Sequence, residues 1–261
     1  MRMRTSLLAV ALVVVVVAGG VSPAGAITDG TPDGNKHPQV GALIADHMFT
    51  DGTWAYCSGT LISPTVFLTA AHCGKPGQTT ARVSFSTHYR DGDTVYSGRY
   101  IADPSYGGRH SDPHDMAVVV FTKAIPNITP ARLPTANLLD RLKDDHTLAT
   151  ATFTPVGYGS PAPTDGPDGE TYLYTDTRNQ TSGSFQSLEK VWLTLSQNPS
   201  TGDGGTCHGD SGGPDFLGGP DSDLLVATTI TGDSACRATN VDRRLDSASA
   251  RRFLGRFVAL P

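Results

Sequence analysis

The chain has 261 residues, with 20 basic and 25 acidic side chains and a net charge of −5. Because no basic excess is available to neutralise phosphates, nucleic-acid binding is disfavoured. Hydrophobic residues make up 38%, enough for a substantial core, whereas 29 glycines and 18 prolines break the chain too often for a helical bundle or coiled coil. The composition therefore favours one or two domains built from many short strands.

Residues 1–26 have the pattern of a secretory signal peptide. Arg2 and Arg4 give a positive start, residues 7–18 form an unbroken apolar run, and Ala24-Gly-Ala26 matches a signal-peptidase site. The alternative, a retained membrane anchor, is disfavoured because the run is shorter than the roughly 20 residues that span a bilayer. We therefore expect a secreted, extracellular protein that begins at Ile27 and has left the membrane after cleavage.

Short apolar runs rich in β-branched and aromatic residues recur along the remaining chain, separated by Gly, Pro, Asp and Asn. This alternation predicts strands. The runs occupy residues 39–44, 59–62, 66–69, 82–86, 116–121, 149–153, 190–195 and 224–230. Helical periodicity is convincing only at the end, where Phe253, Leu254, Phe257 and Val258 share one face behind a serine cap. That pattern predicts a helix over about 247–258 that docks on the core.

The four cysteines fall into two local groups, Cys57 with Cys73 and Cys207 with Cys236. Export makes disulfides the expected state, and four cysteines allow three connectivities. No Cys-x-x-Cys spacing occurs in the sequence, so zinc binding and redox chemistry are disfavoured.

Three motifs in chain order indicate nucleophilic catalysis. The run 68–73 places His72 beside a cysteine, Asp115 stands at the start of an apolar run, and Gly209-Asp-Ser-Gly-Gly-Pro214 presents Ser211 among glycines. A serine hydroxyl needs a base to remove its proton, and histidine is the usual base. A carboxylate at the mouth of a buried strand is costly unless it is paired, and orienting an imidazole would pair it.

Residues 209–213 also fit Gly-x-Ser-x-Gly, the nucleophile elbow of the α/β-hydrolases. Those enzymes place an acid and then a histidine after the serine. No histidine follows Ser211, and the alternating helices are missing. The order of the motifs therefore excludes this class of esterase.

At these residues the chain resembles the trypsin-like (chymotrypsin-fold) serine peptidases, secreted bacterial type. The resemblance includes Ile27-Thr-Asp-Gly30, the stretch 57–73, Gly157-Tyr-Gly159, the stretch 207–214 and Cys236. It implies an all-β fold of two antiparallel six-stranded β-barrels, with the active site between them and a C-terminal α-helix. One peptidase domain would then follow the signal peptide. Its expected bounds are 27–261, with barrel one at about 27–135, barrel two at about 136–246 and the helix at about 247–258.

The resemblance also implies a role for each site residue. Ser211 would be the nucleophile, His72 the general base and acid, and Asp115 the orienting carboxylate. The backbone N–H groups of Gly209 and Ser211 would form the oxyanion hole. Thr231 would supply the hydroxyl that hydrogen-bonds the aspartate. The implied disulfides are Cys57–Cys73 and Cys207–Cys236.

Specificity in this family depends on the pocket base, six residues before the nucleophile, where Gly205 stands. Relatives that cleave after Arg or Lys carry Asp there, because a buried cation needs a carboxylate partner. We therefore expect the substrate residue before the scissile bond (P1) to be uncharged, apolar and of moderate size. Asp233 and Asp242 are alternatives, either as substitute carboxylates or as ordinary solvated aspartates. The other pocket residues that the resemblance implies are Thr206, His208, Thr231 and Gly232.

Activation in the family follows when a freed Ile-type N-terminus pairs with the aspartate before the nucleophile. The corresponding residues here are Ile27 and Asp210. Because the signal-peptidase site directly precedes Ile27, no propeptide fits between them, and we expect export itself to activate the enzyme. The alternative is that cleavage falls elsewhere and Ile27 is an ordinary strand residue.

The sequence thus predicts a secreted serine endopeptidase that hydrolyses peptide bonds through an acyl-enzyme intermediate. The alternative is a catalytically inactive, peptidase-like binding protein on the same scaffold, whose usual signature is a missing member of the catalytic set. All three members are present in this chain. Expected partners are polypeptide substrates and a proteinaceous inhibitor, without nucleic acid, and the enzyme is expected to be a monomer.

No metal or other cofactor is expected. No cluster of carboxylates follows Cys73, where some relatives bind calcium. His110, Asp112 and His114 resemble a ligand set, but Pro113 and the adjacent Asp115 favour a structured approach to the catalytic carboxylate.

Overall fold

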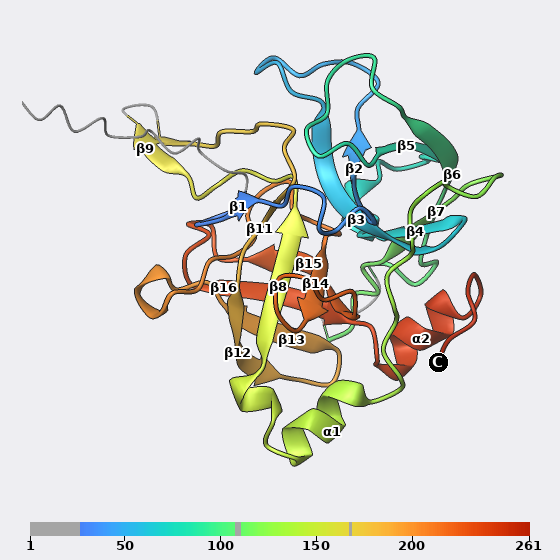
Figure 1. Cartoon of the computed structure of the whole chain (residues 1–261). Coiled ribbons are helices and arrows are strands. Elements are labelled where there is room, and N and C mark those ends of the chain that lie inside the picture. The colour runs from blue at the N-terminus through green and yellow to red at the C-terminus, as the bar shows by residue number, and fades with distance from the viewer. Residues whose placement is uncertain (1–26, 108–110, 167–168) are drawn as a thin grey trace, which may run out of the picture.

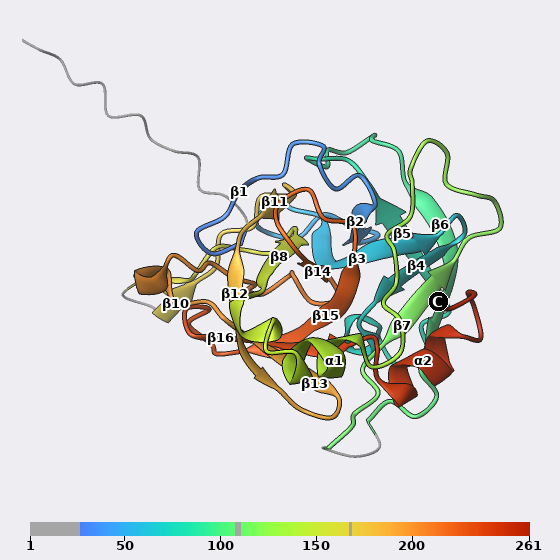
Figure 2. The same ribbon diagram turned by 60° about the horizontal axis from the view of Figure 1, so that its bottom comes forward.

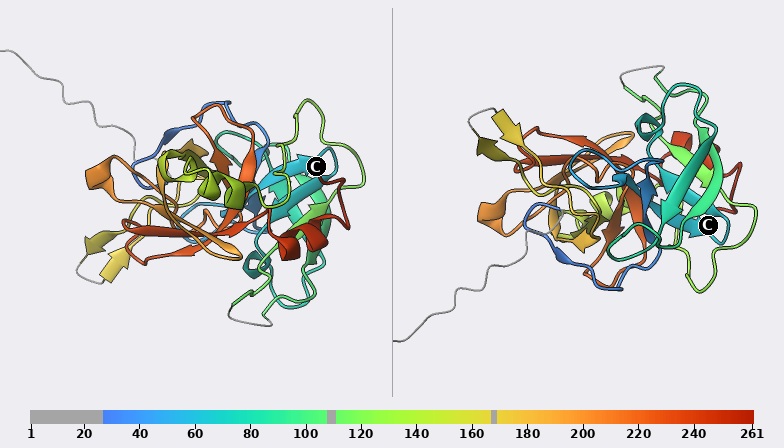
Figure 3. Two further views of the ribbon diagram at one scale, coloured as in Figure 1. Left: turned by 90° about the horizontal axis from the view of Figure 1, so that it is seen from below. Right: turned by 90° about the horizontal axis from the view of Figure 1, so that it is seen from above.

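The computed structural model describes residues 27–107, 111–166 and 169–261, so the predicted signal peptide lies outside the described residues. The first half of the described chain forms one barrel and the second half another (Figure 1). In Figure 3 the two barrels lie side by side, with the cool colours on one side and the warm colours on the other.

The first barrel closes six antiparallel strands in the order β2-β3-β4-β7-β6-β5, and β5 pairs back onto β2. The strands are rich in Val, Leu, Ile and Phe, and their side chains alternate between the barrel interior and its surroundings. Their bounds are β2 (Val40–Ile44), β3 (Ala55–Ser63), β4 (Val66–Thr69), β5 (Thr80–Ser84), β6 (Tyr96–Ala102) and β7 (Ala117–Val120).

The second barrel runs β8-β12-β13-β16-β15-β14, and pairing of β14 with β8 closes it. Its strands are β8 (Thr152–Gly157), β12 (Gly183–Leu188), β13 (Trp192–Ser196), β14 (Pro214–Leu217), β15 (Leu225–Gly232) and β16 (Thr239–Arg244). Two short strands extend the sheet from β8, namely β11 (Asn179–Gln180) and β1 (Thr31–Pro32). A separate hairpin joins β9 (Thr164–Gly166) and β10 (Gly169–Thr171).

The predicted fold class is confirmed, with two closed six-stranded antiparallel barrels and a C-terminal helix, α2 (Ala248–Leu254). The helix is shorter than the predicted 247–258 because it ends at Gly255, although Phe257 and Val258 still pack on the core. The strand patterns did not predict α1 (Leu138–Asp144) or the 3-10 turns η1 (Ala71–Cys73), η2 (Leu148–Thr150) and η3 (Pro199–Thr201). No helix of the described residues is both long and apolar enough to cross a membrane.

One apolar cluster is shared by both barrels and by α2. It joins Val40 and Leu68 of the first barrel to Phe216 and Leu225 of the second, and Phe253 of α2 packs into it. Figure 2 shows α2 lying beside β7, against the first barrel. Burial of this apolar surface fixes the position of one barrel relative to the other. The loops that meet between the barrels are therefore held in place.

A buried ion pair ties the N-terminal segment to both barrels. The side chains of Asp33 and Arg178 are completely buried, and Arg178 Nε lies 2.8 Å from Asp33 Oδ2. Arg178 also donates to the carbonyl oxygens of Val40 and Phe85, while Asp33 accepts from the ring of His37. Burial alone would raise the pKa of Asp33, but the His37 hydrogen bond and the Arg178 charge lower it.

Arg178→Met should lower the free energy of unfolding by about 3–5 kcal/mol, because removal of one partner leaves a buried charge without compensation. The measurement is urea unfolding. Arg132→Met is the matched control, since Arg132 pairs with Asp223 at the surface with side chains 66% and 46% exposed. That change should cost no more than about 1 kcal/mol. Equal losses in the two variants would contradict a structural role for the buried pair.

Candidate active site

His72 lies in η1 directly after β4, and its backbone is held from two directions. The neighbouring Cys73 forms a disulfide with Cys57 of β3, with a Cα–Cα distance of 6.2 Å. The buried hydroxyl of Tyr100 donates to the carbonyl oxygens of the two residues before His72, at 3.1 and 2.9 Å. The imidazole therefore projects from a segment that has little freedom to move.

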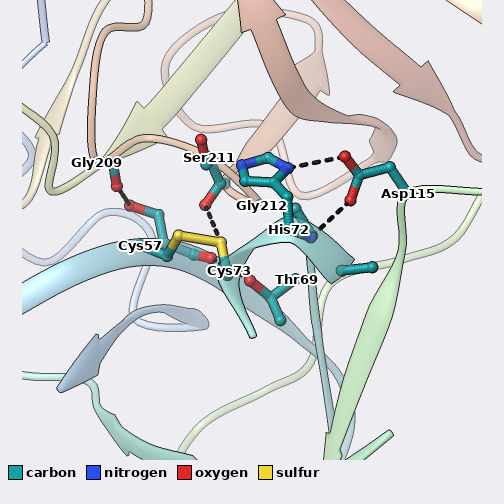
Figure 4. The surroundings of a disulfide bond; sticks show 12 residues. Cys57, Thr69, His72, Cys73, Asp115, Gly209, Ser211 and Gly212 are labelled. Carbon is teal, nitrogen blue, oxygen red and sulfur yellow. Dashed lines mark hydrogen bonds and ion pairs between the residues drawn. A yellow bond between two sulfur atoms is a disulfide. The ribbon is translucent and has the colours of Figure 1, made fainter. Parts of the chain in front are cut away.

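Asp115 fixes the orientation of this imidazole with two hydrogen bonds. The carboxylate lies just before β7 and is almost completely buried. Oδ1 accepts from the backbone N–H of His72 at 2.9 Å, and Oδ2 lies 2.8 Å from Nδ1 (Figure 4). Since a carboxylate can only accept, Nδ1 carries a hydrogen, and in the neutral ring Nε2 is then the acceptor.

Ser211 lies on the other side of the same ring. Figure 4 shows it opposite Asp115, next to the free edge of the imidazole. Its carbonyl oxygen accepts from the N–H of Ser58 at 2.9 Å and lies 3.7 Å from the sulfur of Cys73. The structure thus brings together three residues that are far apart in sequence, at the junction of the two barrels.

Ser58 of β3 is the principal site residue that sequence patterns did not reveal. Besides its bond to Ser211, its hydroxyl donates to the carbonyl oxygen of Gly209 at 3.0 Å and accepts from the N–H of Tyr158. The first barrel thereby holds the serine loop of the second. Gly212 shows how close the approach is, because a Cβ there would lie 2.2 Å from the Thr69 hydroxyl.

The turn before Ser211 presents two backbone N–H groups. Gly209 has a φ of +96°, which favours glycine, and the N–H of Asp210 closes the turn onto the carbonyl oxygen of Cys207 at 3.0 Å. Among residues 27–107, 111–166 and 169–261, the N–H groups of Gly209 and Ser211 donate no hydrogen bond. Both are therefore available to an oxygen atom of a ligand.

Asp210 is a completely buried carboxyl group behind this turn. Its oxygens accept from the backbone N–H groups of Gly159 and Cys207, at 2.8 and 2.9 Å. In the part of the chain that the structure describes, no cation lies within ion-pair distance of it. Burial raises the pKa of Asp210 to about 7. A Cβ on Gly157 or Gly159 would lie 2.2 or 2.5 Å from the carboxyl oxygens, which explains both glycines of this motif.

The N-terminal residues run against the predicted pocket base. Ile27 is 1% exposed, and Thr28 forms an antiparallel bridge with Gly205, with hydrogen bonds of 2.8 and 3.1 Å. The first described residues, the predicted pocket base and the Ser211 loop are thus contiguous in the fold.

The remaining predicted pocket residues lie around the end of β15. The hydroxyl of Thr206 donates to Asn240 Oδ1 at 2.7 Å, and Asn240 pairs with Gly232 in the sheet. His208 is exposed, and its ring meets the edge of Tyr172 with a centroid distance of 4.4 Å. Tyr172 also donates to the carbonyl oxygen of Ser234 at 3.4 Å, so it connects two loops beside the pocket.

The two candidate carboxylates differ sharply. Asp233 accepts hydrogen bonds from the backbone N–H groups of residues 237, 238 and 239, so it organises its own loop. Asp242 is completely buried next to the equally buried Asp215, and its carboxyl oxygens accept no hydrogen bond from a donor among the described residues. Burial raises the pKa of both carboxyl groups, and the charge of Asp215 raises that of Asp242 further. Neither Asp233 nor Asp242 is a solvated loop aspartate with a free carboxylate.

The site offers little to a metal ion. His72 lies near Cys57 and Cys73, but both sulfur atoms are committed to the disulfide and offer no thiolate. His114 lies between two carboxylates, with Nδ1 at 3.1 Å from Asp103 and Nε2 at 3.7 Å from Asp112. His110, the other histidine of this candidate set, lies outside the described residues.

The family model described as Trypsin matches residues 33–247 of the chain. The chain belongs to the trypsin family. A similar solved structure is titled "HL collagenase structure at 1.7A resolution"; it has 19% sequence identity and a TM-score of 0.65, and the match covers 88% of this chain and 97% of that chain. At this identity the likeness concerns the fold. The two disulfides, Cys57–Cys73 and Cys207–Cys236, have the pairing that the resemblance to trypsin-like peptidases implied.

One expectation taken from the trypsin family is wrong. Thr231 is exposed, and no hydrogen bond joins its hydroxyl to Asp115 among the residues that the structure covers. The reason is an irregularity of β15 between Thr229 and Thr231, which shifts the alternation of side chains. Ile230, the residue before Thr231, is half-buried and packs against the apolar cluster of the first barrel.

Asp210 should make stability depend on pH in a chain whose Ile27 nitrogen remains in a peptide bond. Because the folded pKa of about 7 exceeds the ordinary 3.8, the stabilising contribution is complete below pH 3.8 and is lost as pH rises towards 7. Relative to Asp210→Asn, the parent should lose roughly 4 kcal/mol of unfolding free energy across this range. Urea unfolding at pH 4 and pH 7 measures it. A difference between the two proteins that does not change with pH would contradict the assignment.

Proposed function

We propose that the chain is a secreted serine endopeptidase that hydrolyses peptide bonds with Ser211, His72 and Asp115. The observation that carries the proposal is the doubly hydrogen-bonded pair of His72 and Asp115, with Ser211 at the free edge of the ring. Membership of the trypsin family supports it, because this family acts on polypeptide substrates.

The first half of the reaction forms an acyl-enzyme. His72 Nε2 accepts the proton of Ser211 Oγ while that oxygen attacks the substrate carbonyl carbon, and Asp115 stabilises the resulting imidazolium. The N–H groups of Gly209 and Ser211 then donate to the oxyanion of the tetrahedral intermediate. His72 returns the proton to the leaving amine, which departs with the C-terminal part of the substrate.

The second half releases the acid product. A water molecule gives a proton to His72 and attacks the acyl carbonyl carbon, and the same two N–H groups hold the second oxyanion. The proton then returns to Ser211 Oγ. The described residues include no hydrogen bond from Ser211 Oγ to His72, and catalytic hydrogen bonds commonly tighten only in the substrate complex.

Activation belongs to the same proposal. A free ammonium group at Ile27 would supply the cation that the buried carboxyl of Asp210 lacks, and would hold the turn that presents Gly209. Removal of the signal peptide would then activate the enzyme without a separate propeptide. At the pocket, Gly205 brings no carboxylate, so we propose an uncharged P1 residue.

Ser211→Ala should abolish peptidase activity and leave folding and secretion intact, because the change is small. Residual acceleration of roughly 10³–10⁴-fold over water should remain from the oxyanion hole and substrate binding. The measurement is peptide hydrolysis by the purified variant, with fluorophosphonate labelling of the parent at Ser211. If the folded parent neither cleaves peptides nor takes the label, the inactive binding protein becomes the better assignment.

One alanine added before Ile27 should reduce kcat/KM by about 10²-fold or more, because the ammonium can no longer reach Asp210 and a buried pair is lost. The melting temperature of the barrels should change little. Ile27→Val with a free N-terminus is the control and should stay within a few-fold of the parent. N-terminal sequencing of the secreted protein is the direct check, and an active chain that begins elsewhere would refute this activation step.

A further inference from the structure

Gln197 occupies the space of the side chain that Gly205 lacks. Gln197 follows β13, and a Cβ built on Gly205 would lie 1.8 Å from its Oε1 and 2.3 Å from its Cδ. A Cβ on Gly232 would lie 3.6 Å from Nε2 of the same amide. The amide therefore lies between the two glycines that the family resemblance places at the base and wall of the substrate pocket.

The orientation of this amide is determined by its surroundings. Nε2 donates to the carbonyl oxygen of Thr239 at 3.0 Å. The backbone N–H of Gln197 donates to the carbonyl oxygen of Ala238 at 3.1 Å. A flipped amide would set its oxygen against the Thr239 carbonyl oxygen, so Oε1 must face Gly205. Gln197 is 1% exposed, and Oε1 has no hydrogen-bond partner among the described residues. Buried acceptors are rarely left unpaired, so this oxygen has a hydrogen bond left to form.

The neighbouring polar side chains are engaged elsewhere and place no free carboxylate next to Gln197 Oε1. The hydroxyl of Thr206 is already committed to Asn240, and Asp233 is committed to its own loop. Asp242 lies buried next to Asp215, and burial raises the pKa of both carboxyl groups, which disfavours a charged carboxylate there. The unpaired acceptor that lies where a side chain on Gly205 would be is thus a neutral carbonyl oxygen.

We propose that Gln197 is a specificity-determining residue, whose Oε1 accepts a hydrogen bond from a neutral donor at the tip of the P1 side chain. This inference rests on the proposed peptidase function. It replaces the apolar P1 residue expected from the sequence with an uncharged one that carries a terminal N–H or O–H, namely Gln, Asn or Tyr. A site that hydrogen-bonds such a group rejects the analogue that lacks it, because the acceptor is then buried unpaired.

The test compares the cleavage of peptides that differ only at P1. One pair has Tyr or Phe at P1, and the other has Gln or Met, so that only the first member of each pair carries a hydrogen-bond donor. The parent enzyme should favour the donor member of each pair at least tenfold in kcat/KM. Gln197→Leu should bring both ratios close to one. Gln197→Glu should raise cleavage after Lys at least tenfold relative to cleavage after Gln, because a carboxylate then replaces the neutral oxygen.

The matched controls are Gln186→Leu and Gln186→Glu, since Gln186 is an exposed glutamine of β12. Both should leave every ratio unchanged. The inference is overturned if the parent prefers Phe over Tyr, if it cleaves chiefly after Lys or Arg, or if folded Gln197→Leu keeps the parental ratios. The kcat/KM ratios of the parent enzyme test the inference even if a Gln197 variant fails to fold. A folded parent that takes no fluorophosphonate label would instead overturn the proposed function, and this inference with it.

Discussion

The buried carboxyl group of Asp210 is the constraint around which the site is arranged. It lies between β8 and the serine loop, and it hydrogen-bonds a backbone N–H group on each side, from Gly159 and Cys207. No atom can be added to Gly157 or Gly159 without a collision with it. A charge in this position is costly without a cation. The same group therefore fixes the turn that presents Gly209, and in the proposed activation step a free ammonium group at Ile27 would supply the missing cation.

The site lies at the junction of the two barrels, and contacts across this junction make it rigid. His72 and Asp115 come from the first barrel and Ser211 from the second, while Ser58 carries three hydrogen bonds across the junction. The apolar cluster shared by both barrels and α2 also holds the two barrels together. The proposed reaction requires proton transfer and nucleophilic attack within hydrogen-bond distance, and a stiff junction would provide that placement. A disulfide on each side of it, at Cys73 and at Cys207, serves that requirement.

The proposed substrate pocket receives a side chain from a distant segment. Gly205 has no side chain at the predicted base, and the amide of Gln197, just after β13, fills that space. Nothing in the local sequence at Gln197 distinguishes it from other polar residues, because its importance arises from contact with residues that are 8 and 35 positions away. Ser58 is similar, since its partners lie about 100 and 150 residues further along the chain.

The sequence by itself determined the features that local chemistry imposes. Apolar runs rich in β-branched residues and separated by turn residues predicted eight of the twelve barrel strands, but not β6, β12, β14 or β16. The glycines around Ser211 predicted a tight turn. Both predictions depend on neighbours within a few residues. Only the tertiary structure decided which side chains meet across strands. Strand β15 is irregular between Thr229 and Thr231, and Thr231 is exposed, which no periodic pattern in the sequence predicted. The sequence did not distinguish the roles of Asp233 and Asp242. In the structure Asp233 accepts hydrogen bonds from its own loop, whereas Asp242 is buried next to another aspartate. Burial and hydrogen-bond partners are properties of the packed chain, so only the tertiary structure separates the two residues.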